Sequence, residues 1–195
     1  MDIIFSTGVM NMRIIAGIYK GRSLKTPMNY DIRPTSEMVK EALFSILMND
    51  IHSSVFVDLF AGTGAVGLEA LSRGAKKVYL VDRSRDSIGI IKSNVNKIGC
   101  QSQVSILASD YRIAMDRINE PVDILFADPP YEEGYNLEIL DSISSSSILK
   151  DSGVIIIEHA RKFKMPTIYK NLEAFKEKKY GKKALIFYRK GKNNE

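Results

Sequence analysis

The stretch "SVFVDLFAGTGAVGLEALSRG", residues 54–74, contains the pattern that most directly indicates the fold. It begins with apolar residues that do not alternate with polar ones before Asp58, which is typical of a strand buried on both faces. Gly62, Gly64 and Gly67 follow in the spacing G-x-G-x-x-G, which allows a tight turn and close approach of a ligand to the backbone. A helix is expected next, ended by Gly74. Strand, glycine turn and helix together predict the first unit of a ligand-binding α/β sheet.

The alternation of strand and helix continues through the middle of the chain. We expect five strands, over residues 54–60, 77–82, 103–109, 122–128 and 153–159, and helices between them over residues 64–73, 86–98, 110–118 and 136–149. Such alternation predicts a parallel sheet covered by helices on both faces. Residues 174–180 and 183–189 face each other across Gly181 with no helix between them, which favours an antiparallel pair at one edge. The expected fold is therefore α/β and Rossmann-like, with a mostly parallel seven-stranded sheet and an antiparallel C-terminal strand.

The chain divides into three parts by composition. Residues 1–11 are expected to form a disordered tail, and residues 12–32, with glycines and basic side chains around a short apolar run, a basic N-terminal β-hairpin. Residues 33–190 would form one domain, which opens with "RPT" and a helix whose apolar residues recur every three or four positions.

Charge is distributed unevenly along the chain. Residues 34–160 hold 11 basic and 18 acidic residues, whereas residues 161–192 hold 12 basic and 2 acidic residues, within a net charge of +5. The N-terminal segment adds five basic side chains, Arg13, Lys20, Arg22, Lys25 and Arg33. Basic ends on an acidic domain favour a polyanionic partner, most simply a nucleic acid, and these five residues are its candidate contacts. The alternative is a solvated, lysine-rich surface.

Several classes of protein are disfavoured by simple counts. The single cysteine, Cys100, excludes a disulfide framework and a cysteine-based zinc site within one chain. We expect no metal. No apolar run approaches the length of about 20 residues that a membrane span requires. We expect a cytoplasmic monomer.

Carboxylates end three successive predicted strands, and they bear on which ligand the glycine turn binds. The turn alone fits a dinucleotide such as NAD and S-adenosylmethionine equally. Asp82 is placed to accept hydrogen bonds from ribose hydroxyls, and Asp110 from an adenine amino group. Asp58 lies directly before the turn, where a pyrophosphate would be repelled and a cationic ammonium or sulfonium attracted. We therefore expect S-adenosylmethionine.

The motif "DPPY", Asp128 to Tyr131, follows the fourth expected strand and so should lie beside the glycine turn. Pro129 and Pro130 stiffen the turn and remove two backbone donors, which leaves the Asp128 carboxylate and the Pro129 carbonyl as fixed acceptors. Two such acceptors suit a planar exocyclic amino group, whose lone pair they can direct at a methyl group. Tyr131 offers a ring on which a base can stack. Catalysis is expected from Asp128, Pro129, Pro130 and Tyr131, without a histidine or covalent nucleophile.

Four segments extend this pattern to nearly the whole chain from Met12: "MRIIAGIYKGRSLKTP", "RPTSEMVKEALFSIL", "DLFAGTGAVGLEALSRGA" and "DPPY". In this order they resemble the RsmD family of Rossmann-like class I methyltransferases. That resemblance implies S-adenosylmethionine-dependent methylation of the exocyclic N2 of a guanine in small-subunit (16S) ribosomal RNA, as free RNA or in a ribosomal particle. Asp128 and Tyr131 would hold the guanine, and the basic hairpin would touch RNA. The candidate cofactor-binding residues are Asp58, Phe60, Ala61, Gly62, Thr63, Gly64, Asp82, Arg83 and Asp110. Departures from the family are some eleven additional residues at the start and Arg83 after Asp82.

Three other functions stay open on the residues alone. The chemistry of "DPPY" also serves the amino groups of adenine or cytosine in DNA and the amide of glutamine. An NAD-dependent oxidoreductase would need a substrate domain or a proton donor that the sequence does not offer. A non-catalytic RNA-binding module could share the fold, since fold does not determine function.

Overall fold

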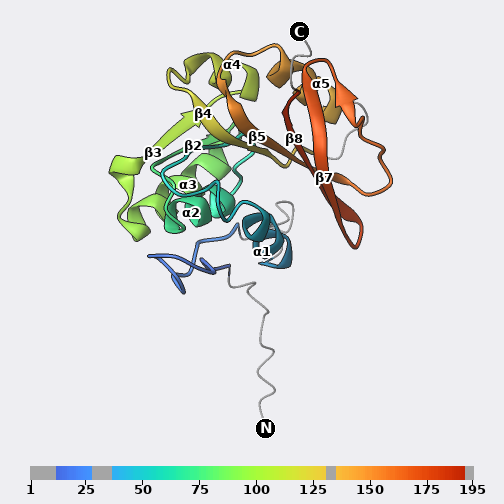
Figure 1. The fold of residues 1–195 in the computed structure, drawn as a ribbon. Coiled ribbons are helices and arrows are strands. Elements are labelled where there is room, and N and C mark those ends of the chain that lie inside the picture. The colour runs from blue at the N-terminus through green and yellow to red at the C-terminus, as the bar shows by residue number, and fades with distance from the viewer. Residues whose placement is uncertain (1–11, 28–36, 131–134, 192–195) are drawn as a thin grey trace.

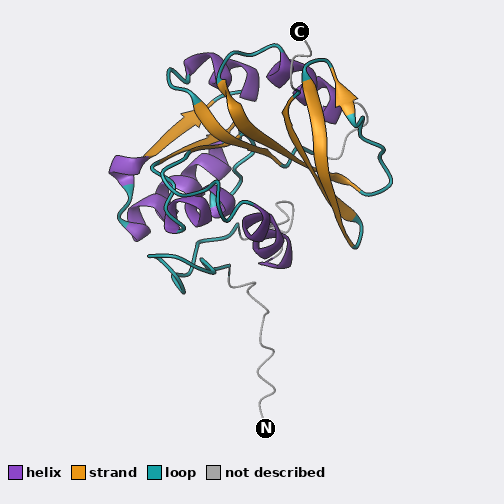
Figure 2. Cartoon of the chain, viewed as in Figure 1, coloured by secondary structure: helices purple, strands orange, loops and turns teal. Residues whose placement is uncertain are grey.

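The computed structural model describes residues 12–27, 37–130 and 135–191 (Figure 1). It contains one mixed sheet between two layers of helices, as Figure 2 shows. The strands are β1 (Val55–Asp58), β2 (Lys77–Asp82), β3 (Val104–Ala108), β4 (Val122–Ala127), β5 (Leu149–Ala160), β6 (Ile168–Tyr169), β7 (Leu172–Tyr180) and β8 (Lys183–Lys190). The helices are α1 (Glu37–Ile46), α2 (Ala65–Ser72), α3 (Arg85–Ile98), α4 (Tyr111–Arg117) and α5 (Tyr135–Ser144), with a 3₁₀ turn at Gln101–Gln103.

The strand order across the sheet is β3-β2-β1-β4-β5-β8-β7-β6. The first five strands are parallel, whereas β8, β7 and β6 are each antiparallel to the strand before them in this order. The chain runs outward from β1 to β3 and then returns to place β4 on the other side of β1. This reversal leaves a crevice at the carboxyl ends of β1 and β4, the usual ligand position in such sheets.

Apolar strands are explained by the two cores that the sheet separates. Successive residues of β1 point to opposite faces: Phe56 belongs to the core under α1, α2 and α3, and Val55 and Val57 to the core under α4 and α5. Both faces of the strand are therefore shielded from solvent, so polar residues do not need to alternate with apolar ones along it. Figure 1 shows these two helical layers on opposite sides of the sheet.

The α/β, Rossmann-like class expected from the sequence is confirmed, with two differences in detail. The sheet has eight strands among the described residues instead of seven, because residues 168–169 add the short β6 beside β7. Helix α5 ends at Ser144, and β5 begins at Leu149 instead of Gly153. The serine-rich end of the apolar segment stops the helix early, because serine hydroxyls compete for backbone hydrogen bonds.

The N-terminal segment forms a looser hairpin than expected. Its two arms meet in one antiparallel bridge between Arg13 and Ser23, with backbone hydrogen bonds from Leu24 to Met12 and from Ile14 to Arg22, and without continuous strands. Residues 28–32 of the expected hairpin and the tail 1–11 lie outside the described residues.

Candidate functional site

A pocket of about 430 Å³ opens at the carboxyl ends of β1, β2 and β4. Of the residues expected at a cofactor or catalytic site, it is lined by Asp58, Phe60, Ala61, Gly62, Thr63, Asp82, Arg83, Asp110, Asp128, Pro129 and Pro130. The topology brings these residues together, because the ends of parallel neighbouring strands share one edge of the sheet.

The Asp82 carboxylate stabilises the glycine turn by accepting a backbone hydrogen bond from it. The backbone N–H of Gly62 donates to one Asp82 carboxylate oxygen at 2.8 Å, and the N–H of Ser84 donates to the other at 2.8 Å. Gly62 and Gly64 have φ values of +54° and +79°, the left-handed region that favours glycine. Asp82 thus fixes the turn as well as facing the pocket, a role that the sequence did not indicate.

Asp58 is a buried carboxylate with an unmet acceptor. One oxygen accepts a long hydrogen bond of 3.3 Å from the N–H of Gly67. The other is buried and has no partner among the described residues. Burial raises the pKa of Asp58 to about 7. A cationic group in the pocket would meet this oxygen, so the site fits the ammonium end of S-adenosylmethionine.

The far end of the pocket carries three aromatic rings and Asp110. Phe60 and Tyr111 lie 5.4 Å apart by ring centroids, and Tyr135 lies 6.0 Å from Phe60. Asp110 caps α4 by accepting from the N–H of Arg112 at 3.0 Å, and it also pairs with the Arg112 side chain. The Ser109 and Tyr111 hydroxyls are buried without a partner in the described part of the chain. Flat apolar faces with unmet polar atoms suit a purine ring.

Asp128 lies at the other end of the pocket, directly after β4. Burial, together with the neighbouring carboxylates Glu158 and Asp58, raises the pKa of Asp128, and the Lys183 cation opposes this rise. Pro129 is buried and Pro130 is exposed. Tyr131 lies outside the described residues, so its stacking role stays a prediction. Asp128 and Asp58 therefore face the same cavity from adjacent strands.

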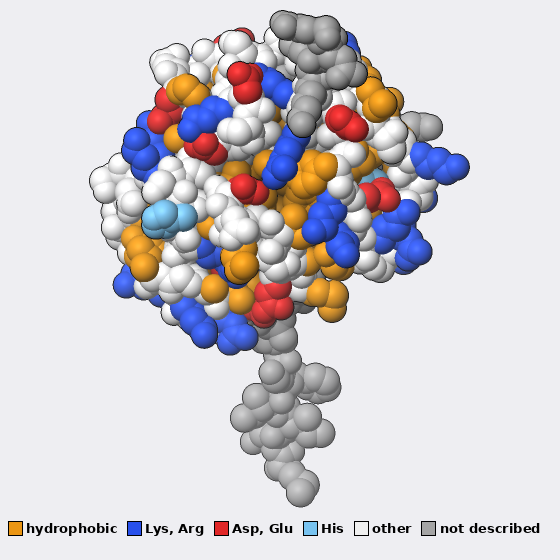
Figure 3. Space-filling view, viewed as in Figure 1, with side chains coloured by type: hydrophobic (Ala, Val, Ile, Leu, Met, Phe, Trp, Pro, Cys, Tyr) orange, Lys and Arg blue, Asp and Glu red, His pale blue; other side chains and the backbone are white. Residues whose placement is uncertain are grey.

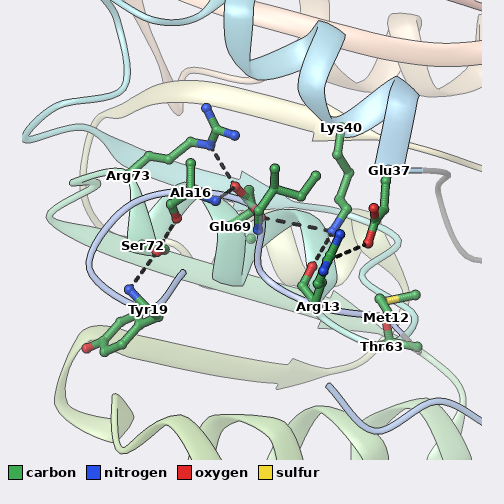
Figure 4. A network of polar contacts seen from close by, with 12 residues as sticks. Met12, Arg13, Ala16, Tyr19, Glu37, Lys40, Thr63, Glu69, Ser72 and Arg73 are labelled. Atoms are coloured by element: carbon green, nitrogen blue, oxygen red, sulfur yellow. Dashed lines mark hydrogen bonds and ion pairs between the residues drawn. The ribbon is translucent and has the colours of Figure 1, made fainter. Parts of the chain in front are cut away.

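The basic hairpin is docked on the domain through its backbone, as Figure 4 shows. The buried Glu69 carboxylate of α2 accepts from the N–H of Ile15 at 2.7 Å and of Ala16 at 3.0 Å. The buried Lys40 ammonium of α1 lies 4.0 Å from Glu69 and donates to the Arg13 carbonyl at 3.0 Å. Both charges are thereby matched, and the hairpin has a fixed place on the helices.

The base of the hairpin reaches the glycine turn. The buried Asn94 side chain of α3 accepts from the N–H of Lys25 at 2.6 Å, and its amide donates to the carbonyls of Lys25 and of Thr63. The Thr63 hydroxyl in turn donates to the Met12 sulfur at 3.4 Å. One amide thus joins the hairpin to a residue that lines the pocket.

The predicted RNA contacts lie on the outer side of this hairpin. Arg13, Lys20, Arg22 and Lys25 are exposed, and Figure 3 shows basic side chains along the lower edge of the molecule in this view. Arg22 is also engaged, because it donates to the Ile98 carbonyl at the end of α3 at 2.7 Å. Arg33 lies outside the described residues.

Comparison with known proteins agrees with this arrangement. The family model described as "Conserved hypothetical protein 95" matches residues 12–189. "Ribosomal RNA small subunit methyltransferase D" of Haemophilus influenzae is 33% identical over 183 residues, which are 91% of this chain and 92% of that protein. The Escherichia coli protein of the same name is 30% identical over 97% of this chain and 95% of its own length.

The chain belongs to the RsmD family. The solved structure of the Escherichia coli protein yhhF supports the same fold, with a TM-score of 0.82 and 29% identity over 93% of this chain and 98% of that one. The family's match begins at Met12, which is also where the described structure begins.

Several residues of this RsmD-family site were missed by sequence reasoning. Ser109, Tyr111 and Tyr135 line the pocket. Ser109 and Tyr111 closely follow the end of β3, which could have indicated them, whereas Tyr135 starts α5 and has no such signal. Lys183 reaches the same pocket from the start of β8, where it forms an ion pair with the buried Glu158 of β5. Nothing in the local sequence of β5 or β8 marks these two residues as part of a site.

The described residues contain no candidate metal site and no candidate membrane span. Within residues 12–27, 37–130 and 135–191, no group of three or more metal-ligating side chains could hold a metal ion. No described helix is long and apolar enough to cross a bilayer.

Proposed function

We propose that this protein transfers a methyl group from S-adenosylmethionine to the exocyclic N2 amino group of a guanine in small-subunit ribosomal RNA, the guanine numbered 966 in 16S RNA. The observation that carries the proposal is one pocket that Asp58, the glycine turn and Asp128-Pro129-Pro130 line together. Family membership, and the name of the relatives that match nearly this whole chain, support the substrate.

The residues suit the two ends of the cofactor. Asp58 would pair with its ammonium, Asp82 would accept from its ribose hydroxyls, and the rings of Phe60 and Tyr111 would form an apolar wall beside its adenine. When bound, the cofactor supplies an electrophilic methyl group on a sulfonium. Binding of the ammonium would also keep Asp58 ionised at neutral pH, because an opposite charge favours the charged form.

Asp128 and the Pro129 carbonyl would receive the amino group of the flipped guanine. An exocyclic amine is a poor nucleophile, since its lone pair is delocalised into the ring. Two fixed acceptors hold its two hydrogens and direct the lone pair toward the methyl group, so the rate enhancement comes from positioning and preorganised electrostatics. Stacking on Tyr131 would hold the base.

The chemical test is Asp128→Ala, measured as tritiated methyl transfer to ribosomal RNA from cells that lack this protein, with the modified nucleoside identified. We expect kcat to fall on the order of 10²–10³-fold, because one preorganised partner of the transition state is removed. Binding of S-adenosylhomocysteine, followed by thermal shift, should persist. Tyr131→Phe, which keeps the stacking face, is the matched control and should retain most activity.

The same assay separates the other functions. Methyl transfer to DNA in place of RNA would indicate a DNA amino-methyltransferase. Stabilisation by NAD and none by S-adenosylhomocysteine would contradict the proposed cofactor. Retained transfer in Asp128→Ala together with loss in Tyr131→Phe would assign catalysis to the hydroxyl and contradict the two-acceptor mechanism.

A further inference from the structure

Asp128 does not stand alone at the end of β4. Strands β4 and β5 are parallel neighbours, with Ala127 opposite Ile157, so the next residues along, Asp128 and Glu158, are opposite each other. Strand β8 pairs with the other side of β5, with Lys183 opposite Ala160. The register therefore brings three charged side chains from three adjacent strands to one point on the pocket edge.

The three side chains are connected. Asp128 shares a side-chain hydrogen bond with Glu158, and Lys183 forms an ion pair with a Glu158 oxygen. Glu158 is fully buried, and Lys183 and Asp128 both line the pocket. An ionised carboxylate only accepts hydrogen bonds, so two carboxyl groups can bond each other only when one of them carries a proton. The pair then holds one proton and one negative charge, which the Lys183 ammonium matches.

We propose that Glu158 and Lys183 are positioning residues for the methyl transfer: Lys183 holds Glu158 as the anion, and Glu158 orients the Asp128 carboxyl and receives its proton. This inference rests on the function proposed above. It assigns roles to two residues that lie 30 and 55 positions beyond Asp128 in the chain.

The proton transfer balances with the groups present. Attack by the amino nitrogen forms the nitrogen–carbon bond and breaks the bond from that carbon to the sulfonium sulfur, which leaves a neutral thioether. The nitrogen, now cationic, gives a proton to the outer oxygen of Asp128. The proton that lay between the two carboxyl groups moves onto Glu158, so the pair ends neutral and the product amine is neutral. The total charge of the site is the same before and after.

Charges on the neighbouring strands set how readily Asp128 accepts that proton. Glu158 from β5 and Asp58 from β1 raise the pKa of Asp128, and Lys183 from β8 lowers it. Removing Lys183 and removing the charge of Glu158 should therefore move the pKa of Asp128 in opposite directions. The opposition measures the electrostatic coupling, whereas the plateau kcat of Glu158→Gln measures the positioning role.

The test is a carbon-13 NMR titration of the Asp128 carboxyl in cofactor-free protein, assigned by comparison with Asp128→Asn. Lys183→Met should raise the apparent pKa of Asp128 by about one unit or more, and Glu158→Gln should lower it by a similar amount. Lys183→Arg should stay near the wild type. The matched control is Lys182→Met, which removes the neighbouring exposed lysine and should leave the titration in place.

The kinetic arm measures kcat against pH with the RNA substrate. The acidic side of the pH profile should shift to higher pH in Lys183→Met and to lower pH in Glu158→Gln. On the plateau of the profile, kcat should be lower in Glu158→Gln on the order of 10²-fold. Binding of S-adenosylhomocysteine should be unchanged in both. If Glu158→Gln does not fold, as judged by that binding, the comparison of Lys183→Met with Lys183→Arg decides alone.

The outcomes separate this inference from the proposed function. If the wild-type protein does not methylate the guanine, the proposed function is contradicted. The NMR titration needs neither RNA nor cofactor, so it still measures the electrostatic coupling of Glu158 and Lys183 to Asp128. Titrations of Lys183→Met and Glu158→Gln that shift in the same direction, or that do not shift, would overturn the inference. If the wild type is active and the acidic side of the kcat–pH profile does not shift in either variant, the inference is overturned as well.

Discussion

A carboxylate buried at the end of a strand is costly unless a cation meets it, and Asp58 is in that position. Its raised pKa, about 7, means that the ligand-free site retains a proton on Asp58 under mildly acidic conditions. The unmet oxygen and the raised pKa have the same cause, which is burial without a compensating charge. Ligand binding should therefore depend on pH.

We predict that S-adenosylhomocysteine binds more tightly as pH rises from 5 to 7. The ammonium of the ligand binds the ionised form of Asp58, so below the pKa of about 7 the affinity should fall by about tenfold per pH unit, and above it the affinity should level off. Titration calorimetry across this range measures the effect. Asp58→Asn should bind weakly at every pH, and a wild-type affinity that is constant from pH 5 to 7 would contradict the role of Asp58.

Gly67 is the third glycine of the turn, and its role is close packing of helix on strand. A Cβ atom at this position would lie 2.3 Å from a Leu80 methyl and 2.8 Å from a Val78 methyl, both in β2. Neither distance is possible unless these side chains or α2 move.

Gly67→Ala should accordingly lower the free energy of unfolding by about 1–3 kcal/mol, the usual cost of overpacking a core. Denaturant unfolding measures this. Gly89→Ala is the matched control, since Gly89 lies in α3 with open space around its Cβ position. That variant should gain up to about 1 kcal/mol from helix propensity. Equal effects of the two substitutions would show that the close approach of α2 to β2 is unimportant.

At the scale of elements, the hairpin and α2 behave as one unit. Glu69 accepts from two hairpin amides and from the Arg73 side chain at 2.7 Å, and it balances the buried Lys40. Burial lowers the pKa of Lys40, and the charge of Glu69 opposes that shift. Among the described residues of this cluster, the Glu69 carboxylate therefore contacts both the hairpin amides and the basic side chains of Lys40 and Arg73.

Glu69→Gln should release the hairpin. Glutamine offers one acceptor oxygen in place of two and leaves Lys40 without its anion, which should cost about 3–5 kcal/mol of stability, as for other broken buried pairs. Trypsin should then cleave at Arg13, Lys20, Arg22 or Lys25 well before it cleaves the domain. Glu37→Gln removes the exposed partner of Arg13 and should change stability by less than about 1 kcal/mol. Protection of the hairpin in Glu69→Gln would show that other contacts hold it.

Across the whole molecule, basic and acidic side chains occupy different regions around the pocket. The hairpin carries exposed basic residues, and its base contacts the glycine turn through Asn94. The turn between β7 and β8 lies at the carboxyl end of β5, where Arg161 donates to the carbonyl of the exposed Lys182. Lys25 at the hairpin base and Lys182 in this turn thus lie near residues that line the acidic pocket, an arrangement that suits a phosphate backbone crossing its mouth.

Changing Arg13, Lys20 and Lys25 together to Ala should weaken RNA binding and flatten its salt dependence. Each lost phosphate contact should reduce the slope of log K against log salt by about 0.7–0.9. Arg22 is left in place, because it also caps α3. Fluorescence anisotropy at several salt concentrations measures the slope. Lys76, Lys150 and Lys190, near the ends of β2, β5 and β8 that face away from the pocket, form a triple for comparison, and an equal loss of slope there would assign the effect to net charge alone.

Features whose cause is local could be predicted from the amino-acid sequence alone. A few neighbouring residues are enough to define a buried apolar strand, a glycine spacing or a proline pair. The class of fold, the glycine turn around Gly62 and the place of Asp128 at a strand end could therefore be predicted. The shared edge of Asp58, Asp82, Asp110 and Asp128 followed as well, because parallel strands put their carboxyl ends together.

The distant side chains that complete these features could be identified only from the folded structure. Glu158 and Lys183 meet Asp128 because β5 and β8 pair in one particular register, and Glu69 binds the hairpin because α2 presents it there. In the sequence, each is one charged residue within a strand or helix pattern, with no spacing that distinguishes it from a solvated charge. Burial and pairing give these charges their roles, and both depend on contacts between segments that are far apart in the chain.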